Sequence, residues 1–120
     1  MTPNTQTLQR LLDAVEAGET PNDDLIIAAL GHRRISGGWY VPRLVKWIMD
    51  PADIRAMGAA KSLHDALVPG WDLLITTYED GLFEVSVSEP LSVKTYDGLS
   101  EIIARAWLLA LIRAVMAGER

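Results

Sequence analysis

Residues 102–117 constrain the fold more than any other stretch, because as a helix they are apolar on every side. A helix of this kind is stable in water only when other elements cover more than one of its faces. Its longest uninterrupted apolar run, 106–112, is far shorter than the ~20 residues that span a membrane. We therefore predict a buried closing helix and no membrane span. Its apolar residues are Ile102, Ile103, Ala106, Trp107, Leu108, Leu109, Leu111, Ile112, Val115 and Met116.

Three runs before that helix alternate apolar and polar residues, which is the pattern of strands with one buried face. They cover residues 72–78, 83–88 and 91–95. A three-residue loop with Gly81 in the left-handed conformation would put Ile75 opposite Val85 and Leu73 opposite Val87. A two-residue loop would turn Ile75 toward a serine, so we favour the loop that gathers the apolar residues on one face. We predict a three-stranded antiparallel meander.

The N-terminal half carries helix signals. Leu8, Leu11, Leu12 and Val15 form one apolar stripe at helical spacing, and Gly18 suits the left-handed end of that helix. A start signal at 20–24 precedes a short apolar helix over 25–30. A second start signal at 50–53 precedes a helix that Pro69 and Gly70 end. These helices are expected to cover the closing helix and the sheet.

Residues 32–49 are ambiguous. Gly37 and Gly38 indicate a turn, and Pro42 favours extended backbone at Val41. Residues 44–49 fit either a strand or a helical turn. The predicted fold class is α+β in a single domain of residues 1–120. Within it, 1–49 form a helical lead-in and 50–120 form a core of helix, three strands and helix.

Composition narrows the function classes. The 120 residues include no cysteine, which excludes disulfides and thiolate metal sites and fits a reducing cytoplasm. The net charge of −5 argues against general nucleic-acid affinity, because phosphate repels an acidic protein. Residues 25–49 are the exception, with four bases and no acid. The N-terminus lacks the basic and apolar regions of a signal peptide.

The group that most resembles a catalytic site is His64 next to Asp65, near Trp71. Neighbours on a helix point about 100° apart, so these two do not form a dyad by themselves. We interpret them as a solvated or hydrogen-bonded pair, and Trp71 as a core anchor between helix and sheet. Asp50 and Asp53 are better explained as helix-start residues than as metal ligands. We predict no catalytic, metal or cofactor-binding residue and no enzyme activity.

One segment mixes bases with aromatic residues, as surfaces that bind single-stranded nucleic acid or acidic proteins do. We favour an internal match between these bases and the acidic parts of the same chain. The segment is nevertheless the candidate binding surface. Its residues are Arg33, Arg34, Trp39, Tyr40, Arg43, Lys46 and Trp47.

Four stretches resemble the phage ABA-sandwich family of small phage and prophage proteins. They are the helical segments 11–17 and 25–30, the junction 62–71, and the closing stretch 104–114. The Leu-Val-Pro-Gly-Trp element at 67–71 is the most specific of them. The resemblance implies an α+β domain encoded by phage or integrated prophage DNA, in the cytoplasm of a bacterial host. It implies no activity and no cofactor.

The expected function is that of a non-enzymatic phage-type accessory protein acting through protein–protein contact with an unknown partner. The alternative is a nucleic-acid-associated module that uses residues 32–47. One stripe of the closing helix could lie on the sheet, which leaves Trp107, Leu108 and Ile112 for other covers. We expect the N-terminal helices to dock there and a homodimer, formed through the C-terminal helix, to cover the rest.

Overall fold

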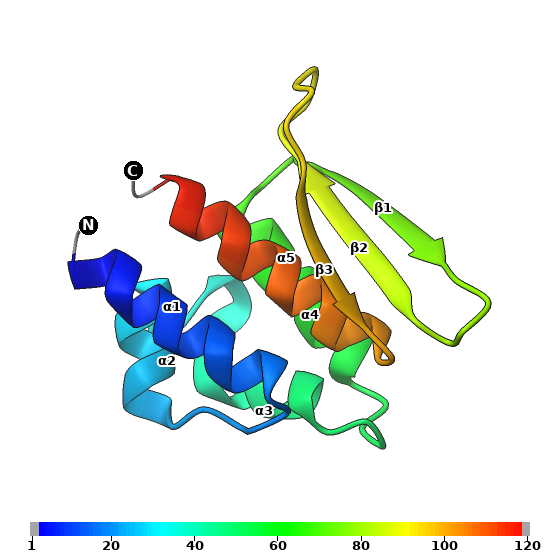
Figure 1. Cartoon of the computed structure of the whole chain (residues 1–120). Helices are drawn as coiled ribbons and strands as arrows, with labels where there is room; N and C mark the ends of the chain where they lie inside the picture. The colour runs from blue at the N-terminus through cyan, green and yellow to red at the C-terminus, as the bar shows by residue number, and fades with distance from the viewer. Residues whose placement is uncertain (1–2, 119–120) are drawn as a thin grey trace.

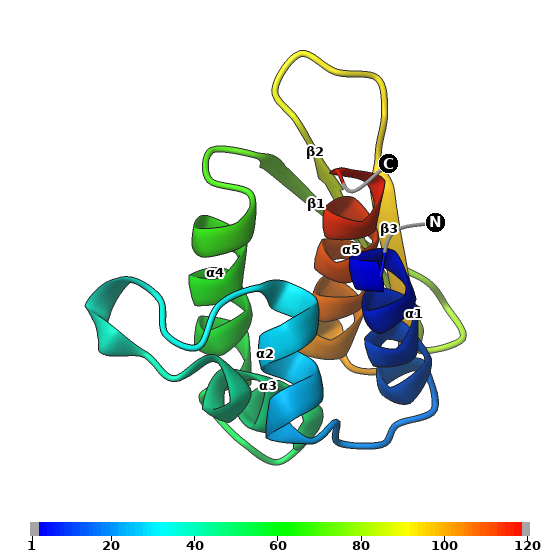
Figure 2. The same ribbon diagram turned by 90° about the vertical axis from the view of Figure 1, so that its left-hand side faces the viewer.

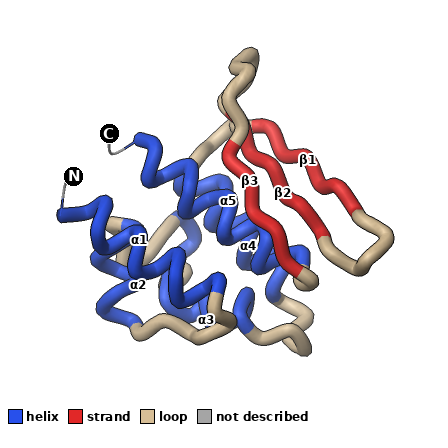
Figure 3. The backbone as a smooth tube through the Cα atoms, viewed as in Figure 1, coloured by secondary structure: helices blue, strands red, loops and turns tan. Residues whose placement is uncertain are grey.

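The computed structural model describes residues 3–118, which form five α-helices, a short 3-10 helix and a three-stranded sheet. The helices gather on one side of the sheet (Figure 3). This arrangement confirms the predicted α+β class. The elements are α1 (Pro3–Glu16), α2 (Asp23–Leu30), η1 (Ser36–Gly38), α3 (Val41–Met49), α4 (Ala56–Leu67), β1 (Asp72–Thr77), β2 (Phe83–Ser88), β3 (Tyr96–Ser100) and α5 (Ile103–Gly118).

Helix α5 is the centre of the molecule. Strands β2 and β3 pack on one of its faces, and α1, α3 and α4 pack on the others (Figures 1 and 2). The helix is apolar all round because its neighbours cover it all round. The prediction of a buried closing helix is therefore confirmed. The α5 side chains buried in this way include Trp107, Leu108, Leu109, Leu111 and Ile112.

The sheet and α5 approach each other closely at Gly98. A Cβ built on this glycine would overlap the carbonyl oxygen of Ala106 and would lie 2.8 Å from the backbone nitrogen of Ala110. The small side chains at 106 and 110 keep one face of α5 flat, so the strand can lie directly on the helix. Gly98 therefore sets the distance between the two layers.

The sheet has the order β1-β2-β3 and is antiparallel throughout. Its first hairpin has the predicted register, with Ile75 opposite Val85 and Leu73 opposite Val87. Gly81 has the left-handed conformation that this loop needs, with φ of 87°. Val85 and Val87 are completely buried, whereas Leu73 and Ile75 are 39% and 38% exposed. The difference arises because α5 covers β2 and β3 and leaves β1 overhanging.

The predicted third strand at 91–95 is wrong. Those residues lie in a loop that projects from the molecule, and the strand forms at Tyr96–Ser100 instead (Figure 1). Leu91 and Val93 are fully exposed, and Leu91 adopts a positive φ of 65°. The position opposite Val85 has no room for a side chain against α5, so Gly98 occupies it. Residue 98 lies between the predicted third strand and the predicted closing helix, and the structure places it in the sheet.

Three helix starts also differ from the prediction. Helix α2 is capped by Asn22, whose side chain accepts the Leu25 N–H at 2.8 Å, and not by Thr20, with which the predicted start signal began. Helix α4 begins only at Ala56, because Asp53 forms a turn by accepting the Arg55 N–H. Helix α3 begins at Val41, before Pro42, rather than after an extended stretch. A proline in the first helical turn loses no hydrogen bond, so it does not exclude this start.

The lead-in and the core contribute to one hydrophobic cluster. Leu8, Leu11 and Val15 of α1 are completely buried, so the predicted docking of the first helix is confirmed. The surface of α5 that we had assigned to a second copy is covered within the chain. A homodimer through this helix stays a prediction, but its premise of an uncovered apolar face is gone. Within residues 3–118 no helix combines the length and apolarity needed to cross a membrane.

Candidate interaction surfaces

The basic–aromatic segment is divided between a small loop and the outer face of α3. In the loop, Arg34 pairs with Tyr40 in an isolated β-bridge, and the Val41 N–H donates to the carbonyl of Arg33 at 2.9 Å. Helix α3 buries its apolar stripe, so Arg43 and Lys46 face solvent. Arg33 is also exposed.

Part of this segment is occupied by contacts within the chain. Lys46 Nζ lies 3.3 Å from an oxygen of Asp23, and the Tyr40 hydroxyl donates to the other oxygen at 3.4 Å. Arg34 donates to the Gly38 carbonyl at 3.0 Å, and its guanidinium lies 5.5 Å from the Tyr40 ring centre. The Lys46 pair is exposed, and such pairs contribute at most ~1 kcal/mol. Asp23 of α2 therefore forms an ion pair with Lys46, one of the four bases of this segment.

Trp39 and Trp47 form a second cluster. Because α3 packs on α4, Arg55 and Ile54 also lie beside these rings. Their rings meet edge to face at 5.7 Å, and the Arg55 guanidinium lies 4.1 Å from the Trp47 ring centre. Two Arg55 nitrogens donate to Asp53 at 2.9 and 2.8 Å, which lowers the pKa of that carboxyl and raises the pKa of the guanidinium. A hollow of about 310 Å³ lies beside the cluster, with Ile54 in its wall. Reasoning from the sequence missed the contribution of Arg55 and Ile54, because it depends on the contact between α3 and α4.

His64 and Asp65 have separate structural roles. His64 is 6% exposed, and its Nδ1 accepts the Trp107 indole N–H at 3.1 Å. The proton must then lie on Nε2, which donates to the Trp71 carbonyl at 3.0 Å. Asp65 points to solvent and pairs with Lys61 at 2.9 Å. The imidazole therefore ties α4 and α5 to the start of β1, and both of its nitrogens are used.

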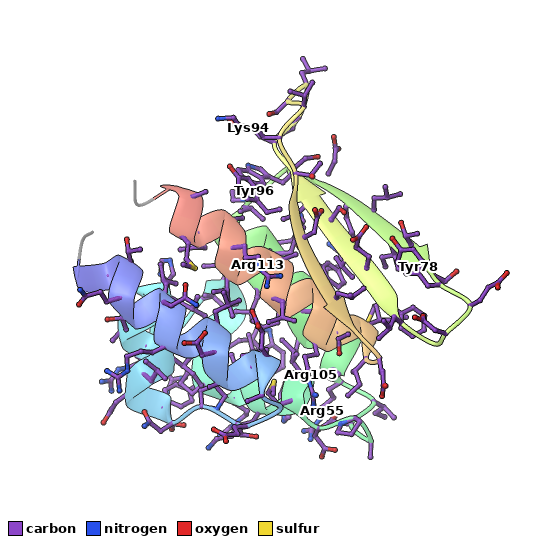
Figure 4. The ribbon with its side chains drawn as sticks, in the orientation of Figure 1. Arg55, Tyr78, Lys94, Tyr96, Arg105 and Arg113 are labelled. Carbon is purple, nitrogen blue, oxygen red and sulfur yellow. The ribbon has the colours of Figure 1, made fainter. Side chains whose placement is uncertain are left out.

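A cavity of about 350 Å³ lies between α1, β3 and α5. Its wall includes Arg105 and Arg113, which are labelled in Figure 4. Arg113 bridges the two flanking elements by donating to the Asp97 carbonyl and, at 2.8 Å, to the Glu16 carboxylate. Arg105 donates to the Met49 carbonyl at 3.3 Å, and its buried Nε has no hydrogen-bond partner within residues 3–118. Arg113 therefore joins α1 to the sheet, and Arg105 joins α5 to the end of α3.

Strand β1 is an open edge of the sheet. Among the described strands it pairs with β2 alone, and none of its apolar side chains is buried. Leu73 and Ile75 extend the buried stripe of Val85 and Val87 beyond α5. Leu74 points to the opposite face and is 63% exposed. An edge strand with exposed apolar side chains on both faces is unusual, because natural proteins protect such edges.

The face of the sheet away from α5 is acidic. Register places Asp72, Glu84 and Asp97 on this face together with Leu74, because Val85 and Gly98 point the other way. Tyr78, which is labelled in Figure 4, donates to Glu84 at 3.3 Å on the same face. The carboxylates of Glu84, Asp97 and Asp80 raise the pKa of the Tyr78 hydroxyl, with Glu84 having the largest effect. We call this surface the acidic sheet face.

Comparison of the chain with protein-family models, with curated proteins and with solved structures gives no match. Among the described residues, 3–118, no three His, Asp or Glu side chains lie close enough together to hold a metal ion. The features that remain as candidate surfaces are the basic–aromatic segment, the β1 edge and the acidic sheet face.

Proposed function

We propose that this chain is a non-enzymatic accessory protein of the phage type, which acts through protein–protein contact at the edge of β1. The observation that carries the proposal is the exposure of Leu73, Leu74 and Ile75 on an edge strand whose outer side has no partner strand among the described residues. Proteins usually shield such edges with lysine, proline, a bulge or a covering loop. The β1 strand contains neither lysine nor proline. Strand addition by a partner would satisfy the backbone and cover the apolar side chains.

The hydrogen-bonding groups of this edge can be assigned. The Tyr78 N–H donates to the Leu82 carbonyl, and bonding and non-bonding pairs alternate along an antiparallel ladder. The backbone of Thr76 and Leu74 therefore bonds to β2. The N–H and C=O groups of Leu73, Ile75 and Thr77 point outward, where a partner strand would meet them. This assignment makes single positions on β1 distinguishable by experiment.

Nucleic-acid binding through residues 32–47 is the alternative. Trp39 is 46% exposed, and Arg33 and Arg43 face solvent, so these three residues favour it. Against it, Lys46 is paired with Asp23, and the sheet carries a strong negative charge. Replacing Arg33 and Arg43 with serine would abolish salt-dependent retention on a DNA column if this alternative were correct.

The strand-addition proposal can be tested with a photo-crosslinking amino acid at Leu74, in the cells that naturally make the protein. When the label at Leu74 is the sole change in the chain, we expect it to form a crosslink to a partner protein. Ile75→Pro removes an outward N–H and should abolish the crosslink, while the β1–β2 ladder stays intact. Ile75→Val keeps that N–H and nearly the same volume, so it should preserve the crosslink.

The control label belongs at Leu91, which is fully exposed in the projecting loop. Crosslinks from Leu91 should not respond to Ile75→Pro. The proposal is wrong if the Leu74 label captures nothing, or if Ile75→Pro leaves its products unchanged. Circular dichroism and thermal melting of the Ile75→Pro variant establish that the fold is retained.

A further inference from the structure

We infer that the strand received by β1 is cationic: an extended segment of another protein in which basic residues flank a short apolar run. This inference rests on the proposed function, since it names the partner chemistry of the same edge. Two observations carry it, namely the charge of the sheet region and the placement of that charge relative to β1.

The charged residues of the sheet region are almost all acidic. Residues 72–101 contain seven acids and one base, a net charge of −6, whereas the whole chain has −5. The single base, Lys94, lies in the projecting loop and not on a strand (Figure 4). A partner strand therefore enters a negative field that no basic side chain of the sheet offsets. Such a field attracts a cationic segment and repels an acidic one.

The charge lies within reach of an added strand. Asp72 is on β1 itself, and Glu84 is opposite Thr76 on the next strand. An added strand would stand about 4.8 Å from β1 and about 10 Å from β2. The Thr76 side chain is small, so a lysine or arginine opposite it can extend across to Glu84. A second basic residue, placed opposite Asp72, would meet that carboxylate directly.

The apolar positions follow from the same register. Residues opposite Leu73 and Ile75 would share the face of Val85 and Val87, so burial favours aliphatic side chains there. The residue opposite Leu74 would cover an apolar side chain on the acidic sheet face. An antiparallel partner running from Thr76 to Asp72 should therefore have the pattern basic–apolar–apolar–apolar–basic. A second copy of β1 lacks the basic residues and would add a second acidic sheet.

The probe is a blocked peptide with the core Lys-Ile-Leu-Val-Lys, and its matched control has glutamate at both lysine positions. Binding is measured by NMR shifts of residues 73–77 and by fluorescence anisotropy. We expect the lysine peptide to bind at least about tenfold more tightly than the glutamate peptide. The preference should decrease between about 50 mM and about 500 mM NaCl, because salt screens exposed charges. Asp72→Asn with Glu84→Gln should remove most of it.

The variants of the edge separate failure of this inference from failure of the proposed function. Ile75→Pro should abolish peptide binding, and Ile75→Val should retain it. Equal binding of the two peptides, or binding of neither while the Leu74 crosslink persists, would overturn the cationic partner and leave strand addition standing. A dimer by light scattering that Ile75→Pro dissociates would overturn it in favour of a second copy. Unchanged peptide binding by Ile75→Pro would overturn both.

Discussion

The helical body and the sheet of this molecule follow opposite rules of composition and burial. Residues 72–101 have a net charge of −6, whereas residues 1–71 and 102–120, with ten bases and nine acids, have +1. In the body, α1, α3, α4 and the sheet cover α5, and Arg113 joins the body to the sheet by bridging α1 and β3. In the sheet, β1 is an open edge with exposed apolar side chains on both faces. The contrast indicates that the body holds the fold while the sheet presents a surface.

The packing geometry explains why one chain contains both a fully covered helix and an exposed edge strand. A single helix lies over two of the three strands, so a meander packed on α5 must leave one strand overhanging. The exposure of β1 therefore follows from the same packing that buries β2 and β3. Substitutions can test this contrast at the contact between the two regions, within the body, or on the sheet alone. The expected effects of the substitutions decrease in that order.

The largest effect is expected at the contact between sheet and body. Gly98→Val would drive a branched side chain into the backbone of α5 at Ala106 and Ala110. We expect a loss of about 4 kcal/mol in the free energy of unfolding, or failure to fold. Urea denaturation measures this loss. Leu99→Val is the matched control, because its side chain is on the outer face and 50% exposed, and it should change stability by less than about 1 kcal/mol. Similar values for both variants would contradict the close approach.

A smaller effect is expected within the body at His64. His64→Ala removes the acceptor of the buried Trp107 N–H and the donor to the Trp71 carbonyl, which should cost about 2 kcal/mol or more. Asp65→Ala, next in sequence, removes only an exposed pair with Lys61 and should cost about 0.5 kcal/mol or less. Thermal unfolding of both variants provides the comparison. A neutral His64→Ala would show that the imidazole does not link α4 and α5.

The sequence predicted the features that depend on local pattern. The buried character of α5 and the pairing of Ile75 with Val85 follow from spacing and from the turn at Gly81. It did not locate the third strand. The alternating pattern at 91–95 suggested a strand there, but packing against α5 places the strand at Tyr96–Ser100. The choice of Gly98 depends on how closely α5 approaches the sheet, and no local pattern records that distance.

The candidate surfaces show the same limit. The segment 33–47 was recognisable from composition, but the contact of Arg55 with Trp47 arises from packing of α3 on α4. The exposure of Leu73 and Ile75 was also hidden, because their pattern is that of a buried face and only the position of α5 leaves them open. Whether residues 33–47 bind a partner stays a prediction.

The smallest effect concerns charge on the sheet alone. The carboxylates of Glu84, Asp97 and Asp80 hold the pKa of Tyr78 above its ordinary value. Because the unfolded pKa is about 10, folding favours the protonated phenol. The resulting stability is present below about pH 10 and is lost as the pH rises through the folded pKa.

Glu84→Gln removes the largest of these influences, so it should lower the pKa of Tyr78, and Asp97→Asn should lower it less. Ring resonances followed by NMR, assigned with Tyr78→Phe, give the pKa in each variant. Saturation with the Lys-Ile-Leu-Val-Lys peptide should shift the pKa in the same direction, because its lysines neutralise the same carboxylates. A Tyr78 pKa that responds to neither Glu84→Gln nor the peptide would mean that these charges do not act together, and the argument for a cationic partner would lose its electrostatic basis.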